Sequence, residues 1–317
     1  MRVNDLRLSV LDVSPIYQHV SPYEALQQSL LLAQTAEKAG YTRYWVPEHH
    51  DLPHLASSCP EVLLAHIGSQ TSTIRIGSGA VLLPYYKPYK VAEAFALLAT
   101  LYPDRIDLGI GRAPGGPAHA SLALSESYLQ QVYQMPALLQ DVTALLNNTY
   151  QIDGRPVIAR PIPPVPAQLW LLGTNRKSAE YAAAVGAGFV FGQFMSDTDG
   201  SEIVELYRNN YQATDKHPAP RAIMAIGVVC AETPETAEAL GEEAKRWSGA
   251  ASLTPESTPM PSTGKKMLVG TPEQIRSELV ALQERTGIDE YMITTPIPDY
   301  EKRLRSYRLL AHAVLGE

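Results

Sequence analysis

Residues 221–230 read RAIMAIGVVC, an apolar run in which only the first residue is charged. A strand that is apolar at successive positions has both faces buried, as strands do in a parallel sheet covered by helices. Seven other short runs are apolar and often β-branched, and we expect them to be strands of the same sheet. They are Leu6–Val13, Arg43–Val46, Ile74–Leu83, Arg105–Gly109, Gln168–Leu172, Phe189–Phe191 and Tyr291–Thr295.

Helix-like segments separate these runs. Ser21-Pro22-Tyr23-Glu24 has the pattern of a capping box, and Thr271-Pro272-Glu273-Gln274 repeats it. Further helices are expected after Thr233-Pro234, around Val91–Leu98 and, as one long helix, over Ser125–Leu146. Strands that alternate with helices predict an α/β protein. Eight strands in 317 residues favour a closed (β/α)8 TIM barrel over an open, doubly wound sheet.

Two segments interrupt the alternation. Tyr150–Pro166 contains Asp153-Gly154 and then four prolines, which predicts a small hairpin followed by a stiff extended lead into the next strand. Residues 248–265, before the last strand, are rich in Ser, Thr, Pro and Ala and have no apolar period. Such a segment is either an active-site lid or a flexible insertion. No break in composition divides the chain, so we expect residues 1–317 to form one domain.

Composition excludes several classes of protein. Hydrophobic residues make up 45% of the chain, charged residues 19%, and the net charge is −7, so we expect neither a nucleic-acid nor a membrane partner. Cys59 and Cys230 are the two cysteines, too few for a disulfide framework or a cysteine-based zinc site. No secretory signal and no membrane-spanning run is evident, which predicts a cytoplasmic protein.

Small and polar residues gather where the predicted strands end. These ends carry Glu48-His49-His50, Gly77-Ser78-Gly79-Ala80, Gly109-Ile110-Gly111-Arg112 and Gly173-Thr174-Asn175. In parallel α/β folds the functional groups lie beyond the carboxyl ends of the strands. We therefore expect one mouth of the barrel to be a ligand site.

The fourth and fifth strand ends predict an anion site. Arg112 offers a planar guanidinium suited to phosphate, and Gly173–Ser178 would place backbone N–H groups and hydroxyls at a helix N-terminus. The alternative is that Arg112 pairs with a carboxylate and Gly173 only turns the chain. A dinucleotide fingerprint is excluded because Pro114 stands where its third glycine would be.

Two further patterns each leave alternatives open. Gly77-Ser78-Gly79 inside a strand indicates either a bulge or a close approach of the backbone to a flat group, such as a bound ring. His49 and His50 are adjacent, so in an extended segment they point to opposite sides, and we expect one of them to face the pocket. The alternative is a structural histidine. No metal is expected, because no metal-ligand spacing is present.

Four segments together identify a resemblance that spans nearly the whole chain. They are YWVPEHH at 44–50, IRIGSGAVLLP at 74–84, RIDLGIGRAPG at 105–115 and VGTPEQI at 269–275. In this combination and order they resemble the bacterial luciferase-like flavin-dependent monooxygenases. The resemblance implies a (β/α)8 barrel that binds FMN and uses FMNH2 and O2 to oxidise a small organic substrate. It also implies a separate NAD(P)H-dependent reductase that supplies the reduced flavin.

The same resemblance assigns roles to individual residues. His49 matches the catalytic histidine beside the flavin. The ring would pack on a non-proline cis peptide at Gly79–Ala80, next to Ser78, and the phosphate would be held by Arg112. The turn that shares the phosphate comprises Gly173, Thr174, Asn175 and Ser178. Luciferases have a cysteine at the position of Gly111 and a Glu-Ser pair where this chain has Thr174-Asn175, so light emission is not expected.

Alternatives remain within and outside this family. Related barrels use the deazaflavin F420 for hydride transfer, and others bind flavin without turnover. The resemblance further implies a homodimer that pairs through the helices near Pro60–Ser72 and Pro88–Leu101. The apolar residues that could form the dimer face, or could instead cover the barrel, are Val62, Leu63, Ile67, Val91, Phe95 and Leu98.

Overall fold

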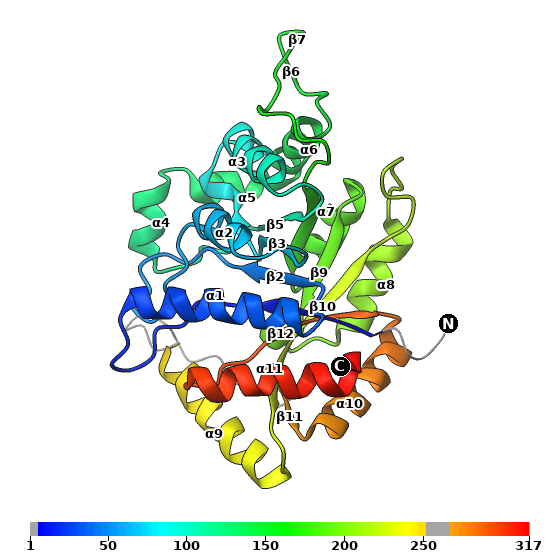
Figure 1. Ribbon diagram of the computed structural model, residues 1–317. Coiled ribbons are helices and arrows are strands. Elements are labelled where there is room, and N and C mark those ends of the chain that lie inside the picture. Colours follow the sequence, from blue (N-terminus) through cyan, green and yellow to red (C-terminus); the bar gives the residue numbers. More distant parts are fainter. Residues whose placement is uncertain (1–5, 252–266, 317) are drawn as a thin grey trace.

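The computed structural model describes residues 6–251 and 267–316 of the chain. Eight parallel strands close into a barrel in the order β12-β1-β2-β3-β5-β8-β9-β10, with β10 pairing back to β12 (Figure 1). This confirms the predicted TIM barrel. The strands are β1 (Arg7–Leu11), β2 (Arg43–Val46), β3 (Arg75–Ser78), β5 (Ile106–Gly111), β8 (Gln168–Gly173), β9 (Gly188–Gly192), β10 (Ala222–Cys230) and β12 (Glu290–Thr294).

Helices surround the barrel (Figure 1). Both capping boxes are present: Ser21 caps α1 together with Glu24, and Thr271 caps α10 together with Gln274. The helices are α1 (Pro22–Lys38), α2 (Pro60–Ser69), α3 (Pro88–Leu101), α4 (Ala118–Leu124), α5 (Tyr128–Tyr133), α6 (Met135–Leu146), α7 (Arg176–Ala184), α8 (Gly200–Asn210), α9 (Pro234–Ala251), α10 (Pro272–Thr286) and α11 (Tyr300–Leu315).

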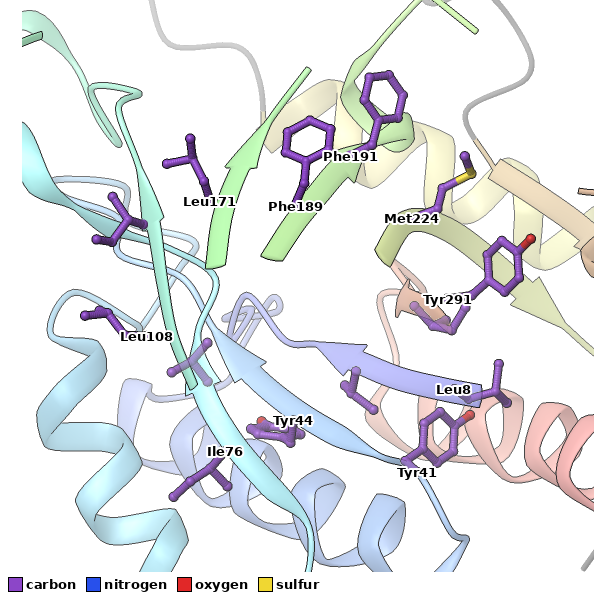
Figure 2. Close-up of a cluster of buried hydrophobic side chains, with 14 of the residues drawn as sticks. Leu8, Tyr41, Tyr44, Ile76, Leu108, Leu171, Phe189, Phe191, Met224 and Tyr291 are labelled. Carbon is purple, nitrogen blue, oxygen red and sulfur yellow. The ribbon is translucent and has the colours of Figure 1, made fainter. Parts of the chain in front are cut away.

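The apolar core has two layers because strand side chains alternate between the two faces of the barrel wall. The larger layer lies between strands and helices, where strand residues such as Tyr44 and Ile76 pack with helix residues such as Leu64. Figure 2 shows some of the side chains of this layer, most of them from strands. The smaller layer fills the barrel interior and includes Trp45 and Trp170, whose rings meet edge to face at 5.8 Å.

Charged groups close the amino-terminal end of the barrel interior. The buried guanidinium of Arg43 (β2) donates to Asp107 (β5) at 2.8 Å and to Glu290 (β12) at 2.7 Å. Asp107 also accepts from Arg75 (β3) at 2.8 Å and from the Trp45 indole at 3.0 Å. Burial alone would raise the pKa of Asp107, but Arg43 and Arg75 hold it below its ordinary value. Four strands are therefore joined through one ion network.

Some expected elements were wrong in detail. The single helix over 125–146 is instead α5 and α6, which meet at Gln134. Pro136 explains the break, since proline lacks a backbone donor and its ring clashes with the preceding helical turn. The helix α4 and the short strand β11 (Met267–Gly270), which pairs with β10, were not expected.

The two interrupting segments have different outcomes. Strands β6 (Gln151–Ile152) and β7 (Arg155–Pro156) confirm the hairpin, which projects away from the barrel (Figure 1). Asp153 and Gly154 form its turn with φ angles of 51° and 73°. In the segment expected to be a lid or a flexible insertion, residues 248–251 instead continue α9, and the rest lies outside the described residues.

The helix faces suggested for a dimer mostly cover the barrel. Leu63 and Ile67 of α2 and Val91, Phe95 and Leu98 of α3 are buried within the single chain, and Val62 alone of the six is exposed, at 65%. Tyr89, Leu97 and Leu101 are the other exposed large hydrophobic residues of these two helices. The homodimer itself stays a prediction. Among the described residues, no helix has the length and apolarity needed to cross a membrane.

Replacing Asp107 with asparagine tests the ion network. Asp107→Asn leaves Arg43 and Arg75 without part of their buried compensation, so we expect the free energy of unfolding to fall by about 3 kcal/mol or more. The matched control is Asp104→Asn, because Asp104 is exposed and pairs with the same Arg75 at 3.6 Å. We expect that change to cost less than about 1 kcal/mol. Denaturant unfolding measures both, and equal losses would contradict the role assigned to Asp107.

Candidate active site

The third strand is bulged at the barrel mouth. Ile76 and Gly77 of β3 pair with Ile106 and Asp107, but Val81 of β4 (Val81–Leu82) pairs with Ile110, so the β3–β4 side holds one extra residue. The Gly79–Ala80 peptide bond within this bulge is cis. The predicted bulge is thus confirmed, as is the cis peptide that the family resemblance implied.

The flat group that lies against these glycines inside the barrel is the Trp45 indole. A Cβ atom on Gly77 would lie 2.7 Å from Trp45 Nε1, and one on Gly79 would lie 2.7 Å from a methyl group of Leu11. Trp45 and Gly77 are partners in the β2–β3 ladder. Sequence analysis missed this contact; a large residue opposite a glycine on a neighbouring strand was the available signal.

The Ser78 side chain is hydrogen-bonded to the neighbouring strand β5. Its hydroxyl donates to the carbonyl of Gly109 at 2.8 Å and accepts from the Gly109 N–H at 3.0 Å, and the residue is fully buried. The hydroxyl of Ser78 is therefore not available to a bound cofactor in this structure.

Glu48 ties the end of β2 to the segment that follows the cis peptide. Its buried carboxylate accepts from the Leu82 N–H at 2.9 Å and from the Tyr86 hydroxyl at 2.6 Å. The same carboxylate lies 2.7 Å from Nε2 of His50. Sequence analysis assigned no such role to Glu48, although a carboxyl group beside two histidines at a strand end was visible.

His49 and His50 have different surroundings, as their adjacency predicted. His50 pairs with Glu48, whereas Nδ1 of His49 is buried and has no hydrogen-bond partner in the described structure. Burial, together with the nearby His50 and His54, lowers the pKa of His49 to about 4. At neutral pH this imidazole is therefore uncharged. It can donate or accept one hydrogen bond at Nδ1, depending on the tautomer, but it lacks the second N–H proton of a charged imidazolium.

Arg112 directly follows the last residue of β5. Its Nη2 donates to Oδ1 of Asn175 at 3.2 Å, and its guanidinium carbon lies 5.9 Å from the Tyr181 ring centroid. The Tyr128 hydroxyl donates to its backbone carbonyl at 2.8 Å. Within residues 6–251 and 267–316, no carboxylate forms an ion pair with Arg112. The alternative that a carboxylate neutralises it is excluded for this part of the chain.

The start of α7 meets Arg112 at the mouth. Asn175 is the N-cap, and its Oδ1 accepts from the Ser178 N–H at 3.2 Å. A Cβ atom on Gly173 would lie 2.2 Å from the Ser178 side chain, so glycine is what allows the helix to approach the strand. Thr174, between them, is half-buried.

Charge at this helix start favours an anion. The first turn of α7 has no acidic residue and carries the exposed cations Arg176 and Lys177. Cations at a helix N-terminus are repelled by the positive end of the helix dipole. A bound anion would offset the charge of these cations and also interact favourably with the dipole. The structure thus brings Arg112, Gly173, Asn175 and Ser178 together, as expected for an anion site.

An aromatic cluster lies on the other side of the mouth, where sequence analysis expected nothing. The Tyr17 ring is 4.5 Å from that of Tyr300 and 5.5 Å from that of Trp247, and His54 lies 6.2 Å from Trp247. The Tyr17 hydroxyl is buried without a partner. These residues come from the segments after β1, β2 and β12 and from the end of α9, so no local pattern could reveal the cluster.

No metal site accompanies these groups in the described part of the chain. Across residues 6–251 and 267–316, no three His, Cys, Asp or Glu side chains are grouped so that they could hold a metal ion.

Sequence comparisons place these features in a known family. A family model described as luciferase-like monooxygenase matches residues 6–290. The N-acetyl-S-alkylcysteine monooxygenase of Bacillus subtilis (strain 168) is 35% identical over 98% of this chain and 99% of its own. A luciferase-like monooxygenase of Escherichia coli (strain K12) is 33% identical over 96% of each chain.

Solved structures agree with this placement. The structure of apo-MsnO8 is 34% identical, with a TM-score of 0.89 over 99% of each chain. Two more distant structures share the fold. The oxygenating constituent of 3,6-diketocamphane monooxygenase from Pseudomonas putida, in complex with FMN, has 17% identity and a TM-score of 0.74 over 98% and 97% of the chains. An F420-dependent secondary alcohol dehydrogenase has 16% identity and a TM-score of 0.70 over 98% and 99%.

The low pKa of His49 predicts a pH-dependent stability. Unfolded His49 binds a proton near pH 6.5, but the folded chain binds it only near pH 4, so stability present above pH 6.5 is lost as the pH falls towards 4. This contribution should reach about 3 kcal/mol and be missing in His49→Gln. That variant keeps the separate contribution of His217, whose pKa is also lowered by burial to about 4. Denaturant unfolding at several pH values measures it. His66→Gln, at an exposed histidine, is the control and should keep the wild-type dependence; an unchanged slope in His49→Gln would refute the argument.

Proposed function

The chain belongs to the luciferase-like monooxygenase family, and from this premise we propose that it is an FMN-dependent monooxygenase. In this proposal FMNH2, supplied by a separate NAD(P)H-dependent flavin reductase, and O2 oxidise a small organic substrate. The observation that carries the proposal is Arg112, a cation without a carboxylate partner in the described structure, which faces the start of α7 at the mouth.

The residues at the mouth fit a flavin mononucleotide. Arg112 and the first turn of α7, with the Gly173–Ser178 segment, would hold the terminal phosphate by charge-assisted hydrogen bonds. The backbone around the cis Gly79–Ala80 bond carries no large side chain and would support the ring. When bound, reduced FMN supplies the electrons for oxygen chemistry, and the protein contributes binding, orientation and electrostatics.

His49 is the residue of this chain that we assign to the reacting groups. Its imidazole is neutral and lies at the carboxyl end of β2, and its buried Nδ1 has no hydrogen-bond partner in the described structure. There it would donate or accept a hydrogen bond to the bound groups while it stays uncharged. The Glu48 contacts with Leu82, Tyr86 and His50 hold the adjoining backbone in place, so we describe Glu48 as a positioning residue.

The aromatic cluster supports an organic substrate. Tyr17, Trp247 and Tyr300 present apolar ring surface and exclude water from that side of the mouth. The thioether substrate named for the Bacillus subtilis relative has an alkyl group that such a wall could contact.

Reconstitution tests the proposed function. The purified protein, FMN, NADH and a flavin reductase are incubated with 18O2, catalase and a substrate panel that begins with N-acetyl-S-alkylcysteines. We expect substrate-dependent O2 uptake and one 18O atom in the product. Equilibrium binding of FMN and of F420 is measured in parallel. Clear preference for F420 would replace the proposal with hydride transfer. Flavin binding with no labelled product across the panel would favour a non-catalytic flavin-binding protein.

Arg112→Ala tests the phosphate contact. Loss of a charge-assisted hydrogen bond should weaken FMN binding by about ten-fold or more. Riboflavin lacks the phosphate, so its affinity should be nearly unchanged by the same substitution. Flavin fluorescence titration measures both affinities.

Arg155→Ala is the matched control for Arg112→Ala. Arg155 is an exposed arginine on the projecting β6–β7 hairpin, and its removal changes the net charge equally. We expect it to leave both affinities as they are. Equal losses for FMN and riboflavin in Arg112→Ala would mean that Arg112 supports the fold of the site and does not bind phosphate.

A further inference from the structure

A small cavity lies at the amino-terminal end of the barrel, opposite the mouth. Its volume is about 160 Å³, and Arg7, Arg43, Trp170, Arg208, Arg221 and Glu290 are among its lining residues. Arg7, Arg43 and Glu290 are the first residues of β1, β2 and β12, which places the cavity away from the strand ends that carry His49 and Arg112.

Arg221 is the unusual group in this cavity. Its Nη1 donates to Oε1 of Gln168 at 2.9 Å, but Nε and Nη2 are buried and have no acceptor. In the described part of the chain, no carboxylate pairs with it. Burial lowers the pKa of Arg221 from its ordinary value, yet a guanidinium stays charged near neutral pH.

Trp170 adds a third donor without a partner. Its Nε1 is buried and has no acceptor, and only 1% of the residue is exposed. The guanidinium carbon of Arg221 lies 4.7 Å from the Trp170 ring centroid. Guanidinium and indole groups can only donate hydrogen bonds. The orphaned atoms beside this cavity are therefore all of one kind, and they require an acceptor.

The charges around the cavity leave a positive excess. Five arginines and four carboxylates belong to the lining and to the ion pairs that extend from it. The arginines are Arg7, Arg43, Arg75, Arg208 and Arg221, and the carboxylates are Asp104, Asp107, Asp289 and Glu290. Arg43 is compensated by Asp107 and Glu290. Arg208 has no carboxylate partner among the described residues, but it donates to the carbonyls of Thr286 and Gly287. Arg221 is therefore the lining arginine that lacks both a carboxylate and acceptors for two of its nitrogens.

We propose that this cavity binds one small monovalent inorganic anion, of the size of chloride, on Arg221 and Trp170. One negative charge balances the positive excess of one. A halide ion only accepts hydrogen bonds, so it can satisfy the donors of Arg221 and Trp170 and brings no donor that would itself need an acceptor. The volume equals that of only a few liquid water molecules at about 30 Å³ each, so it admits a halide ion with some water and excludes a flavin. The site is independent of the proposed oxygenase chemistry at the mouth.

Bromide in crystals tests the site directly. In wild-type crystals grown with bromide in place of chloride, we expect an anomalous peak within hydrogen-bond distance of Arg221 Nε or Nη2. Arg221→Gln should lose that peak. A cavity that contains only water in the wild type, with bromide confined to the outer surface, would overturn the proposal.

Stability in solution gives an independent readout. Thermal unfolding is followed as chloride replaces gluconate, a much bulkier anion, at constant ionic strength. The wild-type midpoint should rise saturably with chloride, and Arg221→Gln should weaken the apparent chloride affinity at least ten-fold.

The control for the solution experiment is Arg276→Gln. This substitution removes an exposed arginine of α10 and changes the net charge by the same amount. It should keep the wild-type response to chloride. Identical responses in Arg221→Gln and Arg276→Gln would overturn the proposal. If Arg221→Gln does not fold, Arg221→Lys takes its place, and the bromide measurement on wild type remains decisive.

Discussion

One buried guanidinium, that of Arg43, is the contact on which the barrel depends. It reaches Asp107 on one side and Glu290 on the other, and so joins β2 to two strands that it does not pair with. Buried ions are tolerated only when their partners are in place, because an unpaired charge in the interior is strongly destabilising. We infer that this network favours the one strand register in which all partners meet.

This network divides the barrel into two ends with different chemistry. At the amino-terminal end, ions and the Trp45 and Trp170 rings fill the interior and leave only the small cavity beside Arg221. At the carboxyl end, the bulge at Gly79–Ala80 separates β3 from β4. The strand ends there carry groups whose hydrogen-bonding or charge-pairing capacity is not used in the described structure. The Nδ1 atom of His49 and the guanidinium of Arg112 are the clearest of these.

Much of the candidate site could be predicted from sequence, because its residues lie at strand ends that the apolar runs identify. The structure brings Arg112 to Asn175 and Gly173 to Ser178, as the anion-site interpretation required. The roles of these residues in binding FMN stay predictions. Contacts that join distant segments were missed, such as the aromatic cluster around Tyr17.

The sequence by itself determined the strands and most helices, since apolar periodicity and capping residues act over a few neighbours. The helix break near Pro136 also has a local cause, but the apolar pattern of residues 125–146 by itself predicts one continuous helix. Only the tertiary structure decided that Trp45 occupies the space beside Gly77. It also decided that Arg43 pairs with Asp107 and Glu290, while Arg221 has no carboxylate partner among the described residues. These outcomes depend on which strands become neighbours and in what register, and that is settled by packing and charge compensation across the whole barrel.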